Sequence, residues 1–102
     1  DISHFVVEGS DMVHSVDLCA PYASMVHIKD GEKIGDQIEF CLPGAGSIDI
    51  TGFLSALRTN RLENMPVFAE VSVQQSQEPN YKPRDVAEFC FNALDQALGK
   101  LD

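Results

Sequence analysis

The sequence lacks the features that mark several classes of protein. It contains no tryptophan, and its three cysteines, Cys19, Cys41 and Cys90, are widely spaced with no Cys-x-x-Cys pair. This spacing argues against a disulfide framework and against a structural zinc site. No apolar run reaches the roughly 18 residues that a membrane span needs, and the acidic Asp1 does not begin a signal peptide. We therefore expect free thiols in a soluble, cytoplasmic protein without a membrane partner.

Positive charge is also scarce. Seven lysines and arginines stand against 16 aspartates and glutamates, which gives a formal net charge of −9. The basic residues are scattered along the chain rather than clustered. A surface of this charge repels a phosphate backbone, so we expect no nucleic-acid partner.

The composition is that of one globular domain. The chain has 102 residues, 44% of them hydrophobic, and this length allows one buried core. Helical periodicity with suitable caps predicts helices over 11–20, 48–62 and 83–99. The last of these is the most strongly marked, because Pro83 suits the first helical position and Gly99 suits the end.

Short apolar segments alternate with these helices. We predict strands over 24–29 and 66–73, and the first five residues resemble the end of an earlier strand. The segment between the first strand and the second helix is expected to be a long glycine-rich loop. Strands that alternate with helices predict a parallel sheet with right-handed crossovers.

The two expected strands each place a polar side chain opposite an aliphatic face. Strand alternation separates Glu70 from the aliphatic set Val67, Ala69, Val71 and Val73, and in the same way it separates His27 from Val26 and Ile28. A carboxylate in such a strand needs a partner. Glu70 and His27 are therefore candidates for proton transfer or metal binding on one side of the sheet.

Each candidate also has a purely structural interpretation. His27 could be a hydrogen-bonded strand residue, and "DISH" at residues 1–4 could be a frayed terminus. Asp30-Gly31 is a good turn pair in its own right. The Gly-x-Gly loop at 44–46 could approach a phosphate through its backbone, although turns alone explain it.

Five stretches together resemble a known family. "DISH", "HIKDGEK", "PGAGSIDITGFLSAL", "VFAEVS" and "KPRDVAEFCFNAL" are similar, in order and spacing, to the C-terminal part of the sugar phosphate isomerase/epimerase proteins, which are xylose isomerase-like TIM barrels. The resemblance covers essentially all of the chain. It implies an α/β fold in which residues 1–102 form a single partial domain, the C-terminal part of a (β/α)8 barrel with about three βα units.

The resemblance also implies a site and a reaction. A divalent metal ion (Mn, Mg, Co or Zn) would be bound by Asp1, His27 and Glu70. Glu70 would also transfer the proton, and the substrate-binding residues would be His4, Asp30 and Lys33. The implied reaction is isomerisation or epimerisation of a small sugar or keto-sugar through an enediolate.

Two departures from the family pattern bear on this expectation. Ala45 stands where the family loop usually has a glutamate, and "KPR" at 82–84 replaces the usual Asp-Pro-Trp. A full barrel takes about 250 residues, so the resemblance predicts a fragment without the first four to five strands and one further glutamate ligand. We expect these 102 residues alone to be inactive or to bind metal weakly.

Other functions stay open at this stage. A metal-dependent phosphodiesterase of the apurinic-endonuclease type would use similar ligands, although the net charge of −9 argues against it. A lyase acting on a cyclic polyol would use the same ligands as an epimerase. A third alternative is a non-catalytic association module that forms a homo-oligomer or complements an N-terminal half-barrel.

Overall fold

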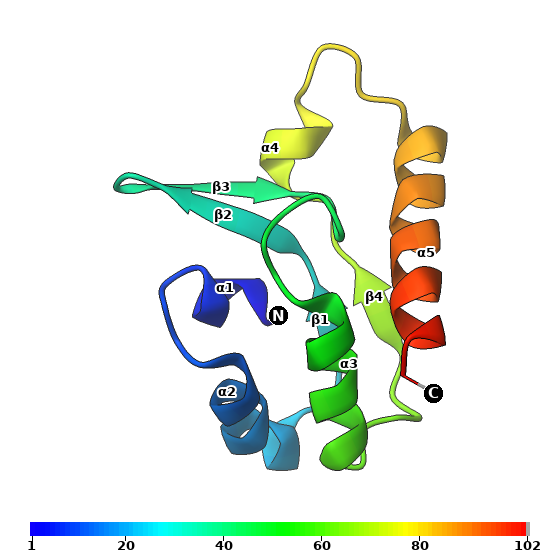
Figure 1. Ribbon diagram of the computed structural model, residues 1–102. Coiled ribbons are helices and arrows are strands. Elements are labelled where there is room, and N and C mark those ends of the chain that lie inside the picture. Colours follow the sequence, from blue (N-terminus) through cyan, green and yellow to red (C-terminus); the bar gives the residue numbers. More distant parts are fainter. Residues whose placement is uncertain (102) are drawn as a thin grey trace.

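The computed structural model describes residues 1–101 (Figure 1). In chain order the elements are helix α1 (Ser3–Val6), helix α2 (Met12–Cys19), a 3₁₀ turn (Ala20–Tyr22), strands β1 (Val26–Ile28), β2 (Asp30–Ile34) and β3 (Gln37–Cys41), helix α3 (Ile50–Thr59), strand β4 (Val67–Ala69), and helices α4 (Val73–Ser76) and α5 (Pro83–Gly99).

The three predicted long helices are confirmed, and their caps explain where they begin. The Asp11 side chain accepts a hydrogen bond from the His14 N–H at 2.8 Å, and the Asp49 side chain accepts one from the Gly52 N–H at 2.9 Å. Each bond satisfies a backbone donor that the first helical turn leaves free. Helix α5 has the predicted bounds, with Pro83 in its first turn.

The strands form two separate two-stranded sheets. Strands β1 and β4 pair in parallel, with His27 opposite Phe68, and α3 lies between them in the sequence. Strands β2 and β3 pair antiparallel as a hairpin whose turn contains Gly35 with φ 62°. This hairpin occupies a segment that the sequence predicted to be a loop.

The predicted fold class is wrong. The structure is a small α/β unit with one short parallel pair and one antiparallel pair, not three βα units of a (β/α)8 barrel. The first residues form helix α1 instead of a strand end. The second predicted strand pairs only over 67–69, and Val73, expected on its aliphatic face, is 65% exposed in helix α4. Ser72 caps that helix by accepting a hydrogen bond from the Gln75 N–H, which ends the extended segment.

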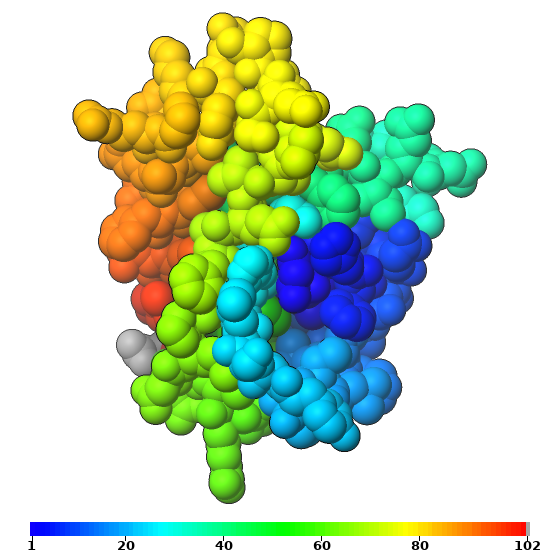
Figure 2. All heavy atoms as spheres, turned by 180° about the vertical axis from the view of Figure 1, so that it is seen from behind, coloured from blue at the N-terminus to red at the C-terminus, as the bar shows by residue number. Residues whose placement is uncertain are grey.

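The core lies on one side of the β1–β4 pair. Ile28 is fully buried there, and the apolar face of α3, which includes Phe53 and Leu57, packs in the same cluster with Ala97 of α5. Burial of each large apolar side chain contributes roughly 1.5–3 kcal/mol. Figure 2 shows the opposite side, where the β1 and β4 segments lie at the surface between the N-terminal residues and α5. We call this side the open face.

Two further observations concern residues 1–101. No helix there is long and apolar enough to cross a membrane. The three cysteines are free, with Cys19 exposed and Cys90 buried.

Candidate functional site

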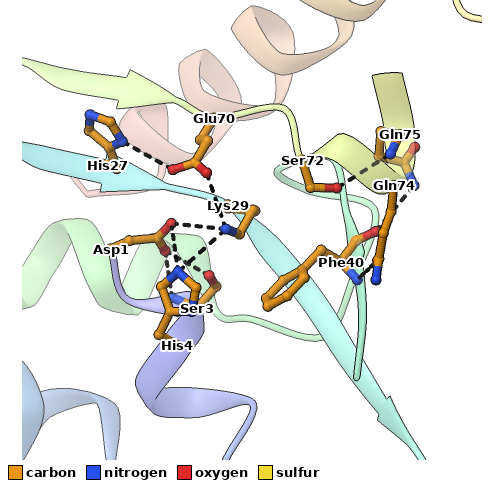
Figure 3. A network of polar contacts seen from close by, with 10 residues as sticks. All are labelled: Asp1, Ser3, His4, His27, Lys29, Phe40, Glu70, Ser72, Gln74 and Gln75. Carbon is orange, nitrogen blue, oxygen red and sulfur yellow. Dashed lines mark hydrogen bonds and ion pairs between the residues drawn. The ribbon is translucent and has the colours of Figure 1, made fainter. Parts of the chain in front are cut away.

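Polar side chains gather where β1 and β4 end (Figure 3). His27 lies on β1, Lys29 directly follows that strand, and Glu70 directly follows β4. The Glu70 N–H donates to the Ile28 carbonyl at 2.8 Å, which extends the strand pairing by one residue and fixes Glu70 beside Lys29. Asp1 and His4 approach from the N-terminal segment. We call the five side chains of Asp1, His4, His27, Lys29 and Glu70 the open-face cluster.

Glu70 is held by one partner on each oxygen. Its Oε2 lies 3.1 Å from His27 Nδ1, and its Oε1 accepts a hydrogen bond from Lys29 Nζ at 3.2 Å. The hydrogen bond with His27 is the main cause that lowers the pKa of Glu70 from 4.5, and Lys29 adds to it against the opposing effect of burial. The carboxylate is therefore ionised at neutral pH. Because an ionised carboxylate only accepts, His27 Nδ1 is the donor in this contact.

Lys29 is the central cation of the cluster. Its side chain is 6% exposed, and Nζ lies 3.4 Å from Asp1 Oδ2 as well as 3.2 Å from Glu70 Oε1. The same nitrogen lies 3.5 Å from His4 Nε2 and 4.4 Å from the centroid of the Phe40 ring. A buried ammonium needs such partners because leaving water is costly for a charge.

Sequence reasoning did not select Lys29 as a site residue. The strand pattern nevertheless places Lys29 on the same face as His27, because Lys29 lies two residues after His27 and side chains alternate along a strand. Its burial could not be predicted, since that depends on Asp1 and Phe40, which come from other parts of the chain.

The two oxygens of Asp1 have different surroundings. Oδ1 accepts hydrogen bonds from the Ser3 N–H at 2.8 Å and the Ser3 hydroxyl at 2.7 Å. Oδ2 is buried and makes no hydrogen bond within the described residues, although the Lys29 ammonium lies within ion-pair distance. An apolar cavity of about 90 Å³, lined by Phe5, Val16 and Met25 among others, also reaches Asp1. Asp1 thus presents one acceptor atom to the cluster that no hydrogen bond occupies among residues 1–101.

Asp30 and Lys33, predicted to contact substrate, lie outside the open-face cluster. Asp30 is 1% exposed, and its carboxylate accepts hydrogen bonds from four backbone N–H groups, those of Gly31, Gly44, Gly46 and Ile48, at 2.8–3.1 Å. Asp30 therefore anchors the glycine-rich loop, and the loop N–H groups considered for phosphate binding already bind a carboxylate. Lys33 is exposed within β2.

The expected metal ligands are only partly brought together. His27 and Glu70 are in contact, whereas the Lys29 ammonium lies between Glu70 and Asp1. Within residues 1–101 no group of three His, Cys, Asp or Glu side chains is arranged to hold a metal ion. As they lie, these residues do not fit a three-ligand centre, and the divalent ion stays a prediction.

The comparisons with known proteins add no assignment. No protein-family model matches the chain, and no curated protein matches it. The similarity to the sugar phosphate isomerases and epimerases therefore stays a prediction from the five stretches of sequence.

Proposed function

We propose that the open-face cluster is the proton-transfer part of an isomerase or epimerase that acts on a small sugar or keto-sugar. The observation that carries the proposal is the Glu70 carboxylate, whose two oxygens contact His27 and Lys29 at the end of the parallel strand pair. The resemblance to the sugar phosphate isomerases and epimerases supports the same class of reaction. The proposal does not depend on a barrel.

Glu70 has the properties of a general base. Its lowered pKa keeps it ionised at neutral pH, and its side chain is 37% exposed, so a substrate on the open face can reach it. The contacts with His27 and Lys29 also weaken it as a base, because they stabilise the charged form. A substrate hydroxyl or carbonyl that takes over one of these contacts raises the basicity of Glu70 at the moment of reaction.

The reaction needs one proton acceptor and leaves one negative charge to stabilise. Glu70 removes the proton from the carbon next to the substrate carbonyl, and the C–H electron pair moves towards the carbonyl oxygen to give an enediolate. The Lys29 ammonium, which adjoins Glu70, offsets the developing charge. Return of the proton to the neighbouring carbon, with transfer of the hydroxyl proton between the oxygens, completes an isomerisation. Protonation of the same carbon from its opposite face would give an epimerisation, and that step needs a second proton donor on that face, so Glu70 alone supports isomerisation.

The polar character of the cluster favours a polyhydroxylated substrate. His4, with an exposed ring, offers a nitrogen donor or acceptor to sugar hydroxyls, whereas the two ring nitrogens of His27 contact Glu70 and Met25. The net charge of −9 disfavours a strongly anionic ligand. We therefore favour a neutral keto-sugar over a sugar phosphate as the first substrate to test.

The test is hydrogen exchange at the substrate carbon. The full chain is incubated in D₂O with dihydroxyacetone or D-fructose, and loss of the proton next to the carbonyl is followed by NMR. Exchange is only the first half of the reaction, so a chain that is inactive in full turnover can still perform it. Parallel samples with chelator and with added Mn²⁺ test the predicted metal requirement.

Glu70→Gln is the decisive variant. We expect it to slow exchange by at least about 100-fold, since removal of a general base typically has an effect of this size. Glu63→Gln, which changes an exposed carboxylate after α3, is expected to leave exchange unchanged. Equal exchange in the wild type and in the Glu70→Gln variant, or no exchange in any sample, would contradict the proposal.

A second candidate function is self-association through the open face. Met25 and Phe68 are 58% and 51% exposed there, and both contact the His27 side chain, so two large exposed apolar side chains gather at one place on this face. This alternative predicts a homo-oligomer that forms without metal or substrate. Sedimentation of the wild type and of Phe68→Ser is measured at several protein concentrations. Self-association predicts an oligomer in the wild type and a monomer in Phe68→Ser. A monomer in both samples would exclude self-association through the open face.

A further inference from the structure

A second cleft lies away from the open-face cluster, where the first turns of α5 face the segment that joins α4 to α5. This segment arches from one helix to the other (Figure 1). The cleft has a volume of about 340 Å³, and the side chains that give it chemical character are those of Glu78, Tyr81, Lys82, Asp85 and Phe89. We call it the α5 cleft.

Local structure fixes two walls of the α5 cleft. Asp85 and Phe89 are four residues apart on α5, so they lie on the same face of that helix. The facing wall is a turn in which the Tyr81 N–H donates to the Glu78 carbonyl at 3.0 Å. Pro79 stands at the second position of this turn, where its fixed φ suits the backbone. The cleft is therefore formed before any ligand arrives.

The lining of the α5 cleft combines acidic and aromatic side chains. Within residues 1–101, the carboxylates of Glu78 and Asp85 have no hydrogen-bonding or ionic partner. Tyr81 and Phe89 supply two aromatic rings, and Phe89 is 44% exposed. The face of an aromatic ring attracts an organic ammonium ion, and neighbouring carboxylates add to this attraction. The lining therefore suits an organic cation.

An anion suits the α5 cleft less well. Lys82 and the amino-terminal end of α5 would attract one. An anion would, however, also lie beside the carboxylates of Glu78 and Asp85, which outnumber the ammonium of Lys82 by two to one. The net charge of −9 acts in the same direction.

A bare metal ion suits the cleft poorly as well. Leu42, Pro79 and Val86 contribute apolar surface to the lining, whereas hard metal ions need oxygen ligands on all sides. No three His, Cys, Asp or Glu side chains in residues 1–101 are arranged to hold such an ion. An ammonium ion that carries methyl groups matches both the apolar surface and the charge.

We propose that the α5 cleft binds a small alkylated ammonium ion. Its methyl groups lie against Tyr81 and Phe89, and its charge lies beside Glu78 and Asp85. This site goes beyond the proposed function and is independent of it, because no residue of the open-face cluster lines the cleft.

The test is an NMR titration of the ¹⁵N-labelled full chain with choline, followed through the backbone signals of residues 78–89. The matched probe is the neutral analogue of choline in which carbon replaces nitrogen, and sodium chloride corrects for ionic strength. We expect saturable shifts with choline and at least about twofold weaker binding of the neutral analogue. Equal binding of the two probes, no saturable shift with choline, or saturable shifts with inorganic phosphate instead would overturn the proposal.

Variants on one helix test the two kinds of contact. Asp85→Asn and Phe89→Leu should each weaken choline binding roughly two- to fivefold. Glu88→Gln and Phe91→Leu are matched controls, because both side chains are exposed on α5 and lie outside the cleft, and they should bind choline like the wild type. Wild-type affinity in Asp85→Asn or Phe89→Leu, or an equal loss in the controls, would overturn the proposal.

Lys82→Met provides a test of opposite sign. Removal of this positive charge should tighten choline binding about twofold. Lys100→Met changes the net charge equally at the other end of α5 and should bind choline like the wild type. Unchanged or weaker binding in Lys82→Met would overturn the proposal. All the substituted side chains are exposed, so we expect every variant to fold, and a cooperative thermal transition verifies it.

Discussion

Two adjacent residues, Lys29 and Asp30, carry buried charge of opposite sign and serve different parts of the molecule. Lys29 contacts the carboxylates of the open-face cluster, whereas Asp30 binds the backbone of the glycine-rich loop. Strand alternation near the end of β1 explains why neighbours face opposite ways. Each charge has partners, which meets the requirement for burying a charge at all.

Asp30 provides a prediction about stability. Asp30→Asn removes the negative charge and places an NH₂ group where four backbone donors converge, so some of these donors lose their acceptor. We expect a loss of roughly 2–4 kcal/mol in the free energy of unfolding. Urea unfolding measures it, with the exposed turn variant Asp36→Asn as the control. A difference between the two variants below about 0.5 kcal/mol would show that Asp30 does not anchor the loop.

Cys41 provides a prediction about reactivity. Burial, followed by the negative charges of Asp30 and Glu32, raises the pKa of the Cys41 thiol from 9.0 to about 11. At pH 8 only roughly one thiol in a thousand would then be ionised, and the thiolate is the reactive form. Alkylation with iodoacetamide, mapped by mass spectrometry, should modify the exposed Cys19 well before Cys41. Equal rates would contradict this environment for Cys41.

At the scale of elements, local sequence determined the helices and long-range contacts determined the strands. Asp11, Asp49 and Pro83 act within one helical turn of their own position, so the helices could be predicted from them. The hairpin could not, because residues 30–41 are rich in charge and lack a clear apolar alternation. Its stability depends instead on contacts from elsewhere, such as the Gln74 side chain accepting from the Phe40 N–H at 2.7 Å.

The glycine-rich loop gives a prediction at this scale. Gly44 has φ 92°, and a Cβ there would lie 2.7 Å from the Ala93 Cβ of α5. Gly44→Ala therefore combines backbone strain with a clash and should cost roughly 2–4 kcal/mol in unfolding free energy. Gly35→Ala, with φ 62° but nothing within 4 Å, should cost roughly 1–2 kcal/mol. The stabilities are measured by thermal or urea unfolding. Equal stability of the Gly44→Ala and Gly35→Ala variants would contradict the close packing of Gly44 against Ala93.

At the scale of the whole molecule, the contact between His27 and Glu70 was more predictable than the fold. Alternation within each strand predicted that His27 and Glu70 share a face, and their side chains do meet. The number of paired strands depends on contacts between distant segments, which no local pattern specifies. The barrel prediction was wrong for this reason, since residues 1–5 and 71–73 do not join the sheet.

The pH dependence of folding provides a prediction for the whole chain. Because the folded state lowers the pKa of Glu70 below 4.5, ionised Glu70 stabilises the fold above that pH, and this contribution is lost as pH falls through the folded-state value. The stability difference between the wild type and Glu70→Gln should therefore be larger at pH 7 than at pH 3. If the stability difference between the wild type and Glu70→Gln stays constant or grows on acidification, the lowered pKa of Glu70 in the folded state would be contradicted. Glu63→Gln is the control.

The most direct test of the central claim is an NMR titration of the Glu70 side-chain carboxyl in the wild type, His27→Ala and Lys29→Met. Our account predicts a wild-type pKa below 4.5 that rises in both variants, because each one removes a hydrogen bond that lowers it. A wild-type pKa at or above 4.5, unchanged by either substitution, would show that Glu70 does not share a site with His27 and Lys29, and the proposed proton transfer would lose its basis.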